Sequence, residues 1–224
     1  MGFYSLDGSG VDSTGTGPTL TEPSGAVSYV AGLSGQAASF DGSGSSYLRA
    51  AIDASGSTNP TFSWGAWVRL NDPSAWNIFL SNDNGGWDRF SQAEGGFWSV
   101  SQGGVQNSPH ATSGDWTFIA HTFDGTNQHL YVDNLAVYTR PDATGAANSF
   151  IDIGRNANGA FPLNGLIDGV FFFDDTLTAG EVDTIRLGGA GGSGVLAVAG
   201  IPEPSSVAFL GLGGLALMLR RRRS

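Results

Sequence analysis

The chain has 224 residues, a formal net charge of −10 and no cysteine. The missing cysteines exclude disulfides, thiolate metal sites and a cysteine nucleophile. Up to Gly200 the sequence holds six arginines, no lysine and 19 acidic residues, a formal charge of −13 that repels phosphate backbones, so nucleic acid is not an expected partner.

The N-terminal end carries no visible secretory signal peptide. Met1 to Leu6 leads directly into an expected first strand, where an exported protein needs a charged stretch and then an apolar one. This leaves three interpretations open: a misassigned start, a fragment, or a protein that is not exported.

Short strands separated by glycine-rich turns are expected through most of the chain. Phe62, Trp64, Ala66, Val68 and Leu70 alternate with smaller or polar residues. Trp67 lies on the opposite face, so this strand is apolar on both sides and suits the interior of a sheet. The pattern predicts an all-β, two-sheet antiparallel sandwich over residues 1–187.

The loop region 71–86 and the residues just after it form a candidate ligand site. Trp76, Asn82, Asp83 and Trp87 combine aromatic rings with amide and carboxylate groups. An exposed indole stacks on a sugar face while polar groups bind its hydroxyls, so these residues are candidate carbohydrate ligands. The alternative is that the tryptophans plug one end of the sandwich.

One short helix is expected at the end of the body. Thr178 and Glu181 have the spacing of a capping box, with Thr178 as the N-cap. A helix over 179–187 would then end at Gly188.

Several motifs in this order resemble one family. The segments that carry the resemblance are Tyr4-Ser5-Leu6-Asp7-Gly8, Ser39-Phe40-Asp41-Gly42, 62–68, 115–125, 130–134, 164–170 and 177–182. Together they resemble the LamG-like domain of the concanavalin A-like lectin/glucanase jelly rolls, with Asn134 in place of the usual glycine. The resemblance implies two curved sheets face to face and leaves function open, because this fold serves lectins, adhesins and hydrolases.

Asp168 is a candidate metal ligand. It shares a strand face with Val170 and Phe172, so it should point inward and need partners. Backbone N–H groups are one solution. The other is a structural Ca²⁺ shared with Asp7 or nearby carbonyls, which the resemblance implies.

Enzymatic activity is not expected. Hydrolysis of glycosides needs two carboxylates across a cleft. The body holds only Glu22, Glu94 and Glu181 as glutamates, and none lies in a strand of alternating acids. A non-catalytic domain that binds glycan or a surface protein is the leading hypothesis; a structural biofilm or coat component is the alternative, and a glycoside hydrolase ranks third.

The C-terminal end changes composition. Residues 188–200 are rich in Gly, Ala and Ser and are interpreted as a flexible linker. Residues 201–224 then contain Pro202, Glu203 and Pro204, an apolar run over 207–219, and Arg220, Arg221, Arg222 and Arg223. The apolar run would form a tail helix of about 20 Å, which is short of the roughly 30 Å hydrocarbon core.

This end resembles the PEP-CTERM sorting signal of Gram-negative bacteria. The resemblance rests on the Pro-Glu-Pro motif, the apolar segment and the arginine cluster, in that order. It implies export, a transient stay in the inner membrane, recognition by an exosortase with cleavage near the motif, and a final place at the cell surface or in the extracellular matrix.

Overall fold

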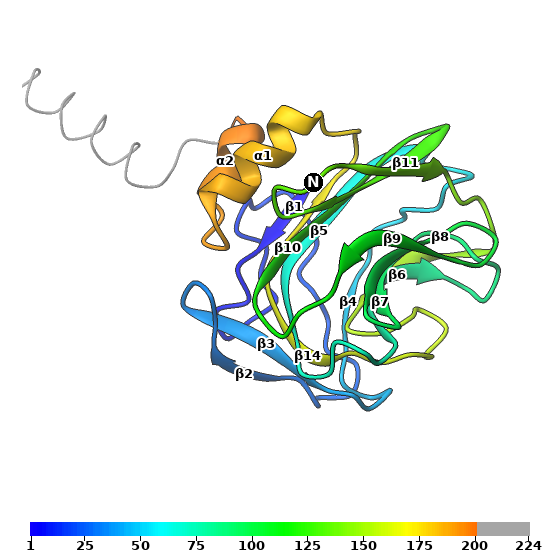
Figure 1. Cartoon of the computed structure of the whole chain (residues 1–224). Coiled ribbons are helices and arrows are strands. Elements are labelled where there is room, and N and C mark those ends of the chain that lie inside the picture. Colours follow the sequence, from blue (N-terminus) through cyan, green and yellow to red (C-terminus); the bar gives the residue numbers. More distant parts are fainter. Residues whose placement is uncertain (201–224) are drawn as a thin grey trace, which may run out of the picture.

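The computed structural model describes residues 1–200, which form two antiparallel sheets packed face to face (Figure 1). The expected all-β sandwich is confirmed. The larger, eight-stranded sheet has the order β12-β11-β10-β5-β14-β3-β2, with β1 paired to β14. Its strands are β1 (Gly2–Tyr4), β2 (Ser28–Ala31), β3 (Gln36–Asp41), β5 (Thr61–Leu70), β10 (Thr117–Asp124), β11 (Asn127–Val132), β12 (Tyr138–Pro141) and β14 (Asn164–Phe173).

The second sheet has six strands in the order β4-β13-β6-β7-β8-β9. Its strands are β4 (Leu48–Ala50), β6 (Asn77–Asp83), β7 (Phe90–Glu94), β8 (Phe97–Ser101), β9 (Val105–Ala111) and β13 (Ala147–Ile153). Hairpins link β6 to β9 in sequence, whereas β4 and β13 join this sheet from distant parts of the chain.

Strand β5 separates two apolar clusters. Phe62, Trp64, Ala66, Val68 and Leu70 belong to the main core between the sheets. Trp67 belongs to a second cluster on the opposite face of the eight-stranded sheet. The two-sided strand predicted from the sequence is therefore confirmed.

Helix α1 (Ala179–Gly188) begins as expected. The Thr178 side chain accepts a hydrogen bond from the Glu181 backbone N–H, and the Glu181 carboxylate accepts one from the Thr178 N–H, which completes the capping box. Val182 and Ile185 face inward and cover the second apolar cluster.

The expected flexible linker over 188–200 is wrong. The segment forms α2 (Ser193–Val198), and Ala190 and Val195 are buried in the second cluster. The glycines permit close packing here: a Cβ at Gly192 would lie 2.1 Å from the Phe3 ring, and a Cβ at Gly169 would lie 2.8 Å from the Ala190 carbonyl oxygen.

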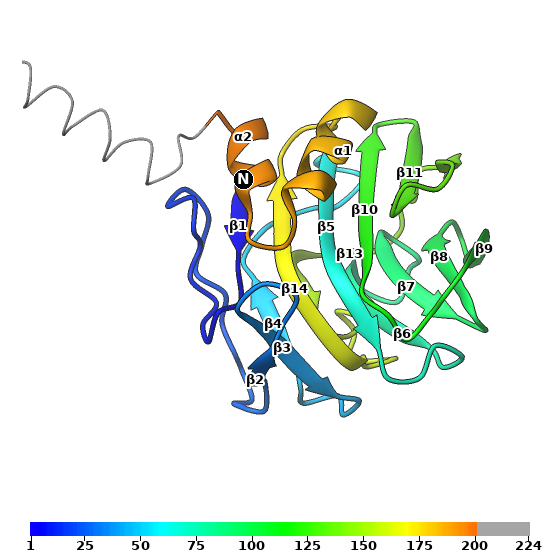
Figure 2. The same cartoon turned by 60° about the vertical axis from the view of Figure 1, so that its left-hand side comes forward.

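Helices α1 and α2 pack against each other and lie on the outer face of the eight-stranded sheet beside β1, across the sandwich from β6–β9 (Figure 2). Among residues 1–200, no helix has the length and apolar character to cross a bilayer.

Candidate functional site: an aromatic hollow on the open sheet

The outer face of the six-stranded sheet carries a hollow of about 160 Å³. On β13, Ile151 and Ile153 point into the core, so Asp152 between them points outward. Cross-strand pairing then places Ser81 and Phe90 on this outer face, through Asp152↔Ser81 and Ser81↔Phe90. The hollow is lined by Trp76, Ile78, Asp83, Gly85, Trp87, Phe90, Gln92, Val105, Asn156, Asn158 and Phe161.

Three exposed aromatic side chains surround the hollow. Trp76, Trp87 and Phe161 are 41%, 42% and 40% exposed. The Trp76 and Phe161 rings are 4.5 Å apart between centroids and tilted by 52°. Large apolar side chains left at a concave surface offer flat faces for stacking against a ligand.

Two of these aromatic residues have a strained backbone. Within residues 1–200, four non-glycine residues have a positive φ, and two of them are Trp87 at 63° and Phe161 at 49°. Such a conformation costs about 1–3 kcal/mol and is concentrated at functional sites. Both strained residues border the same hollow, which suggests that the strain serves to present their rings.

Asp83 ties together the two loops that carry these rings. Its Oδ1 accepts hydrogen bonds from the backbone N–H groups of Gly86 and Asp88, both at 3.0 Å. Its Oδ2 accepts from the Gly85 N–H at 3.1 Å and from the Asn156 side-chain amide at 3.0 Å. The loop between β6 and β7 is thereby fixed to the loop between β13 and β14. Asp83 lines the hollow as predicted, but its oxygens are already occupied by the protein.

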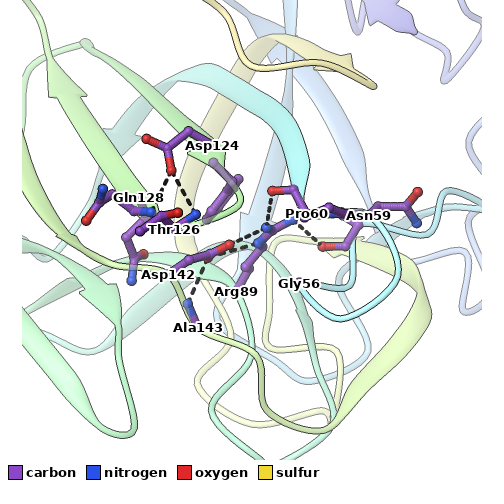
Figure 3. Close-up of polar contacts among 12 residues, drawn as sticks. Gly56, Asn59, Pro60, Arg89, Asp124, Thr126, Gln128, Asp142 and Ala143 are labelled. Atoms are coloured by element: carbon purple, nitrogen blue, oxygen red, sulfur yellow. Dashed lines mark hydrogen bonds and ion pairs between the residues drawn. The ribbon is translucent and has the colours of Figure 1, made fainter.

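Arg89 anchors the first of these loops through a group of buried polar contacts (Figure 3). Its fully buried guanidinium forms an ion pair with Asp142, whose Oδ1 accepts from Nε at 3.1 Å. The remaining N–H groups donate to the carbonyl oxygens of Ala54 at 3.0 Å, Asn59 at 2.8 Å and Pro60 at 2.8 Å. A buried charge with this many partners holds the backbone in one position.

Asn82 does not line the hollow, contrary to expectation. It is fully buried, and its backbone N–H donates to the Arg89 carbonyl at 3.3 Å. Successive side chains on a strand point to opposite faces, so Asn82 points inward where Ser81 and Asp83 point outward. Asp88 is also buried here, and burial raises the pKa of its carboxyl group.

Asp7 and Asp168 meet at the turn between β2 and β3. Oδ2 of the fully buried Asp168 accepts from the backbone N–H groups of Leu33 at 2.8 Å and Ser34 at 3.0 Å. Asp7 accepts from the Gln36 N–H at 2.6 Å. Burial, together with the neighbouring Asp7 charge, raises the pKa of Asp168 to about 6.

Asp7 and Asp168 have one feature of a cation site, an unsatisfied carboxylate oxygen. Oδ1 of Asp168 is buried without a hydrogen-bond partner, and the two carboxylates act on each other. Within the described residues no group of three or more His, Cys, Asp or Glu side chains is arranged to hold a metal. A Ca²⁺ ion here would therefore take its other ligands from carbonyl groups and water.

Some site residues were missed by the sequence interpretation, and others lie beyond the structure. Phe90, Asn156 and Phe161 complete the hollow; the only local signal was a segment rich in Asn and Gly before β14. The sorting residues Pro202, Glu203, Pro204 and Arg220–Arg223, and the apolar run 207–219, lie outside the described residues.

The fold and the hollow together define a lectin-like β-sandwich with one open, aromatic face. The chain belongs to the concanavalin A-like lectin/glucanases superfamily, whose family model matches residues 41–183. Residues 200–223 match the PEP-CTERM protein-sorting motif, which indicates an exported protein that is sorted by an exosortase. A comparison with curated proteins found no match.

Solved structures share the fold. Domain 4 of AbnA, an extracellular GH43 arabinanase from Geobacillus stearothermophilus solved with arabinotriose, is 21% identical with a TM-score of 0.61, covering 81% of this chain and 95% of that domain. The binding domain of botulinum neurotoxin DC, solved with SialylT, is 12% identical with a TM-score of 0.63; the match covers 84% of this chain and 50% of that one. The binding domain of Paraclostridial Mosquitocidal Protein 1 is 16% identical with a TM-score of 0.57, covering 78% and 48%. The chain thus spans about half the length of these two toxin domains.

Proposed function

We propose that the chain is a non-catalytic surface or matrix protein that binds glycan in the aromatic hollow. The observation that carries the proposal is the grouping of Trp76, Trp87 and Phe161, all exposed, around one hollow on the open sheet. Aromatic faces beside fixed amides match the apolar faces and hydroxyl edges of sugars. The arabinanase domain of the same fold was solved in complex with arabinotriose, a carbohydrate, which supports the same interpretation.

The carboxylates around the hollow favour binding over hydrolysis. Glycoside hydrolysis needs an acid and a second carboxylate facing each other across the substrate. Asp83 is the carboxylate that lines the hollow, and four N–H donors already occupy its oxygens. A carboxylate held in this way serves to position the two loops.

A glycan array tests the proposal with the full-length chain in a mild detergent. We expect saturable binding by the wild type, and at least a tenfold weaker affinity in Trp76→Ala and Trp87→Ala, which corresponds to a loss of about 1.4 kcal/mol. Leu187→Ala is the matched control, because Leu187 is an exposed apolar residue on α1, on the helix-covered face. Unchanged binding by both tryptophan variants, or no binding to any glycan, would refute the proposal and favour a structural coat component.

The sorting motif gives the expected location. We propose that residues 201–224 hold the chain transiently at the inner membrane of a Gram-negative cell, that an exosortase recognises and cleaves this tail, and that the domain then reaches the cell surface or matrix. Expression of the full chain with and without the matching exosortase tests this: the enzyme should release a shortened protein, and identical mass spectra in both strains would contradict it.

A structural Ca²⁺ at the turn between β2 and β3 is a separate proposal. Asp7 and Asp168 would hold the ion, which would neutralise two adjacent carboxylates when bound. We expect a higher melting midpoint in Ca²⁺ than in EDTA, with the difference abolished in Asp168→Asn. An equal midpoint in both solutions would mean that backbone N–H groups alone satisfy Asp168.

A further inference from the structure

Two arginines on the open sheet share one carboxylate. Arg49 on β4 donates to Asp152 bidentately, from Nε at 2.7 Å and Nη2 at 3.0 Å. Arg155, just after β13, donates from Nε to Oδ2 of the same carboxylate at 2.9 Å. Asp152 is fully buried, so its single negative charge lies beneath two guanidinium groups and leaves a local excess of one positive charge.

Aromatic rings hold the two guanidinium groups in place. Cζ of Arg155 is 3.3 Å and that of Arg49 is 5.5 Å from the centroid of the Tyr47 ring. Cζ of Arg49 also lies 3.6 Å from the centroid of Phe150. Stacking and ion pairing already fix both guanidinium groups. A ligand that binds them therefore costs little further side-chain entropy.

Each guanidinium retains an unused nitrogen. Arg155 donates from Nη1 to the Gly44 carbonyl, and within the described residues neither Arg155 Nη2 nor Arg49 Nη1 donates to a protein acceptor. The side chains remain 15% and 29% exposed. Positioned N–H groups beside excess positive charge are suited to a carboxylate.

The sheet register places this arginine pair beside the aromatic hollow. Arg49↔Asp152, Asp152↔Ser81 and Ser81↔Phe90 form one row across β4, β13, β6 and β7 on the outer face. Three strand spacings of roughly 4.8 Å separate the ends of the row by about 14 Å, within reach of a short oligosaccharide. Arg155 also directly precedes Asn156, which lines the hollow.

The net charge of the domain limits which acidic glycans can bind at the arginine pair. The body carries −13 up to Gly200, so a polyanion lying along it would be repelled, while a single carboxylate at the arginine pair feels mainly charges within a Debye length of about 8 Å. We infer that the open face recognises a neutral glycan bearing one isolated acidic sugar, with the neutral part in the hollow and the carboxylate at Arg49 and Arg155. This inference rests on the proposed glycan-binding function.

Matched glycan pairs test the inference in titrations with the full-length chain. The probes are 3′-sialyllactose against lactose, glucuronosyl-xylotetraose against xylotetraose, and hexagalacturonate as the polyanion. For at least one pair we expect the acidic member to bind about tenfold tighter, a gain of about 1.4 kcal/mol from charge-assisted hydrogen bonds. Hexagalacturonate should bind more weakly than that acidic member.

Arg155→Gln is the informative variant, since it leaves the bidentate Arg49–Asp152 pair intact. It should remove the preference for the acidic member and leave the affinity for the neutral member unchanged. Arg186→Gln, the same charge change on α1, should keep the preference.

The outcomes separate this inference from the proposed function. Equal affinity for acidic and neutral members, or a preference that survives in Arg155→Gln, overturns the inference while glycan binding stands. Tighter binding of hexagalacturonate overturns the restriction to an isolated acid. Absence of binding to every probe and every array glycan overturns both.

Discussion

The two outer faces of the sandwich both carry large aromatic residues, but within residues 1–200 helices cover only one of them. On the eight-stranded sheet, Trp67, Phe118 and Phe171 lie beneath α1 and α2 and are at most 5% exposed. On the six-stranded sheet, Trp76 and Phe161 remain about 40% exposed. Aromatic content therefore does not by itself mark a binding face. The presence or absence of the C-terminal helices decides which face is available.

The largest expected effect on stability comes from removing Arg89, which supports the open face of the six-stranded sheet. Arg89→Met should lower the free energy of unfolding by about 3–5 kcal/mol, because it leaves the buried Asp142 charge unpaired. Arg140→Met, which removes an exposed arginine on β12, is the control in chemical denaturation. A loss below about 1 kcal/mol for Arg89→Met would mean that the buried ion pair does not hold this face together.

The pH dependence of stability tests the interior that the two sheets share. Burial, together with the nearby positive charge of Arg89, lowers the pKa of His121 to about 3. The unfolded chain binds this proton near pH 6.5 and the folded chain does not, so the stability that neutral His121 contributes is present above pH 6.5 and is lost as pH falls.

At 1.36 kcal/mol per pKa unit, the loss is about 3 kcal/mol between pH 7 and pH 4. His121→Gln should show a flatter pH dependence in urea titrations, with the carboxylates contributing equally to both proteins. Parallel curves for the two proteins would contradict the assignment.

Val195→Ala tests how much α2 stabilises the helix-covered face of the eight-stranded sheet. Val195 is fully buried, so the truncation should cost about 2 kcal/mol from lost burial and a residual cavity. Val137→Ala, at a 43% exposed position, should cost little by comparison. If both variants melt at the same temperature, α2 does not stabilise the domain.

The smallest stability change is expected on the open face itself. Trp87→Ala should lower the free energy of unfolding by no more than about 1 kcal/mol, because the side chain is 42% exposed, while the glycan affinity falls at least tenfold. Denaturant titration beside the binding assay checks both quantities. A cost above about 1 kcal/mol would show that Trp87 plugs the end of the sandwich.

Local patterns were enough to predict much of the fold. The alternation along β5 and the capping box at Thr178 depend on residues close in sequence, and both are confirmed. The interpretation of 188–200 failed because glycine was equated with flexibility. Here Gly192 allows the chain to approach Phe3, a contact between opposite ends of the sequence.

The candidate site was predictable only in part, for the same reason. Trp76 and Trp87 lie in one turn-rich region and were found together. Phe161 joins them because its carbonyl oxygen accepts a hydrogen bond from the Ile78 N–H at 3.0 Å, beside the bridge between Ile78 and Pro162. The Arg49–Asp152 pair joins residues 103 positions apart. No local pattern encodes such a register, because distant strands pair through the packing of the whole sandwich.

The docked helix α2 also gives the domain an orientation. The sorting motif begins at residue 200, two residues beyond the end of α2, so any tether through the C-terminal end attaches on the helix-covered side. The six-stranded sheet lies across the sandwich from α1 and α2 (Figure 2). The arginines and the aromatic hollow belong to the outer face of that sheet, so they would point away from the attachment. Removal of the sorting motif by cleavage near residues 202–204 would leave α2 in place, so a released domain would keep its single exposed face and would not gain a second adhesive one.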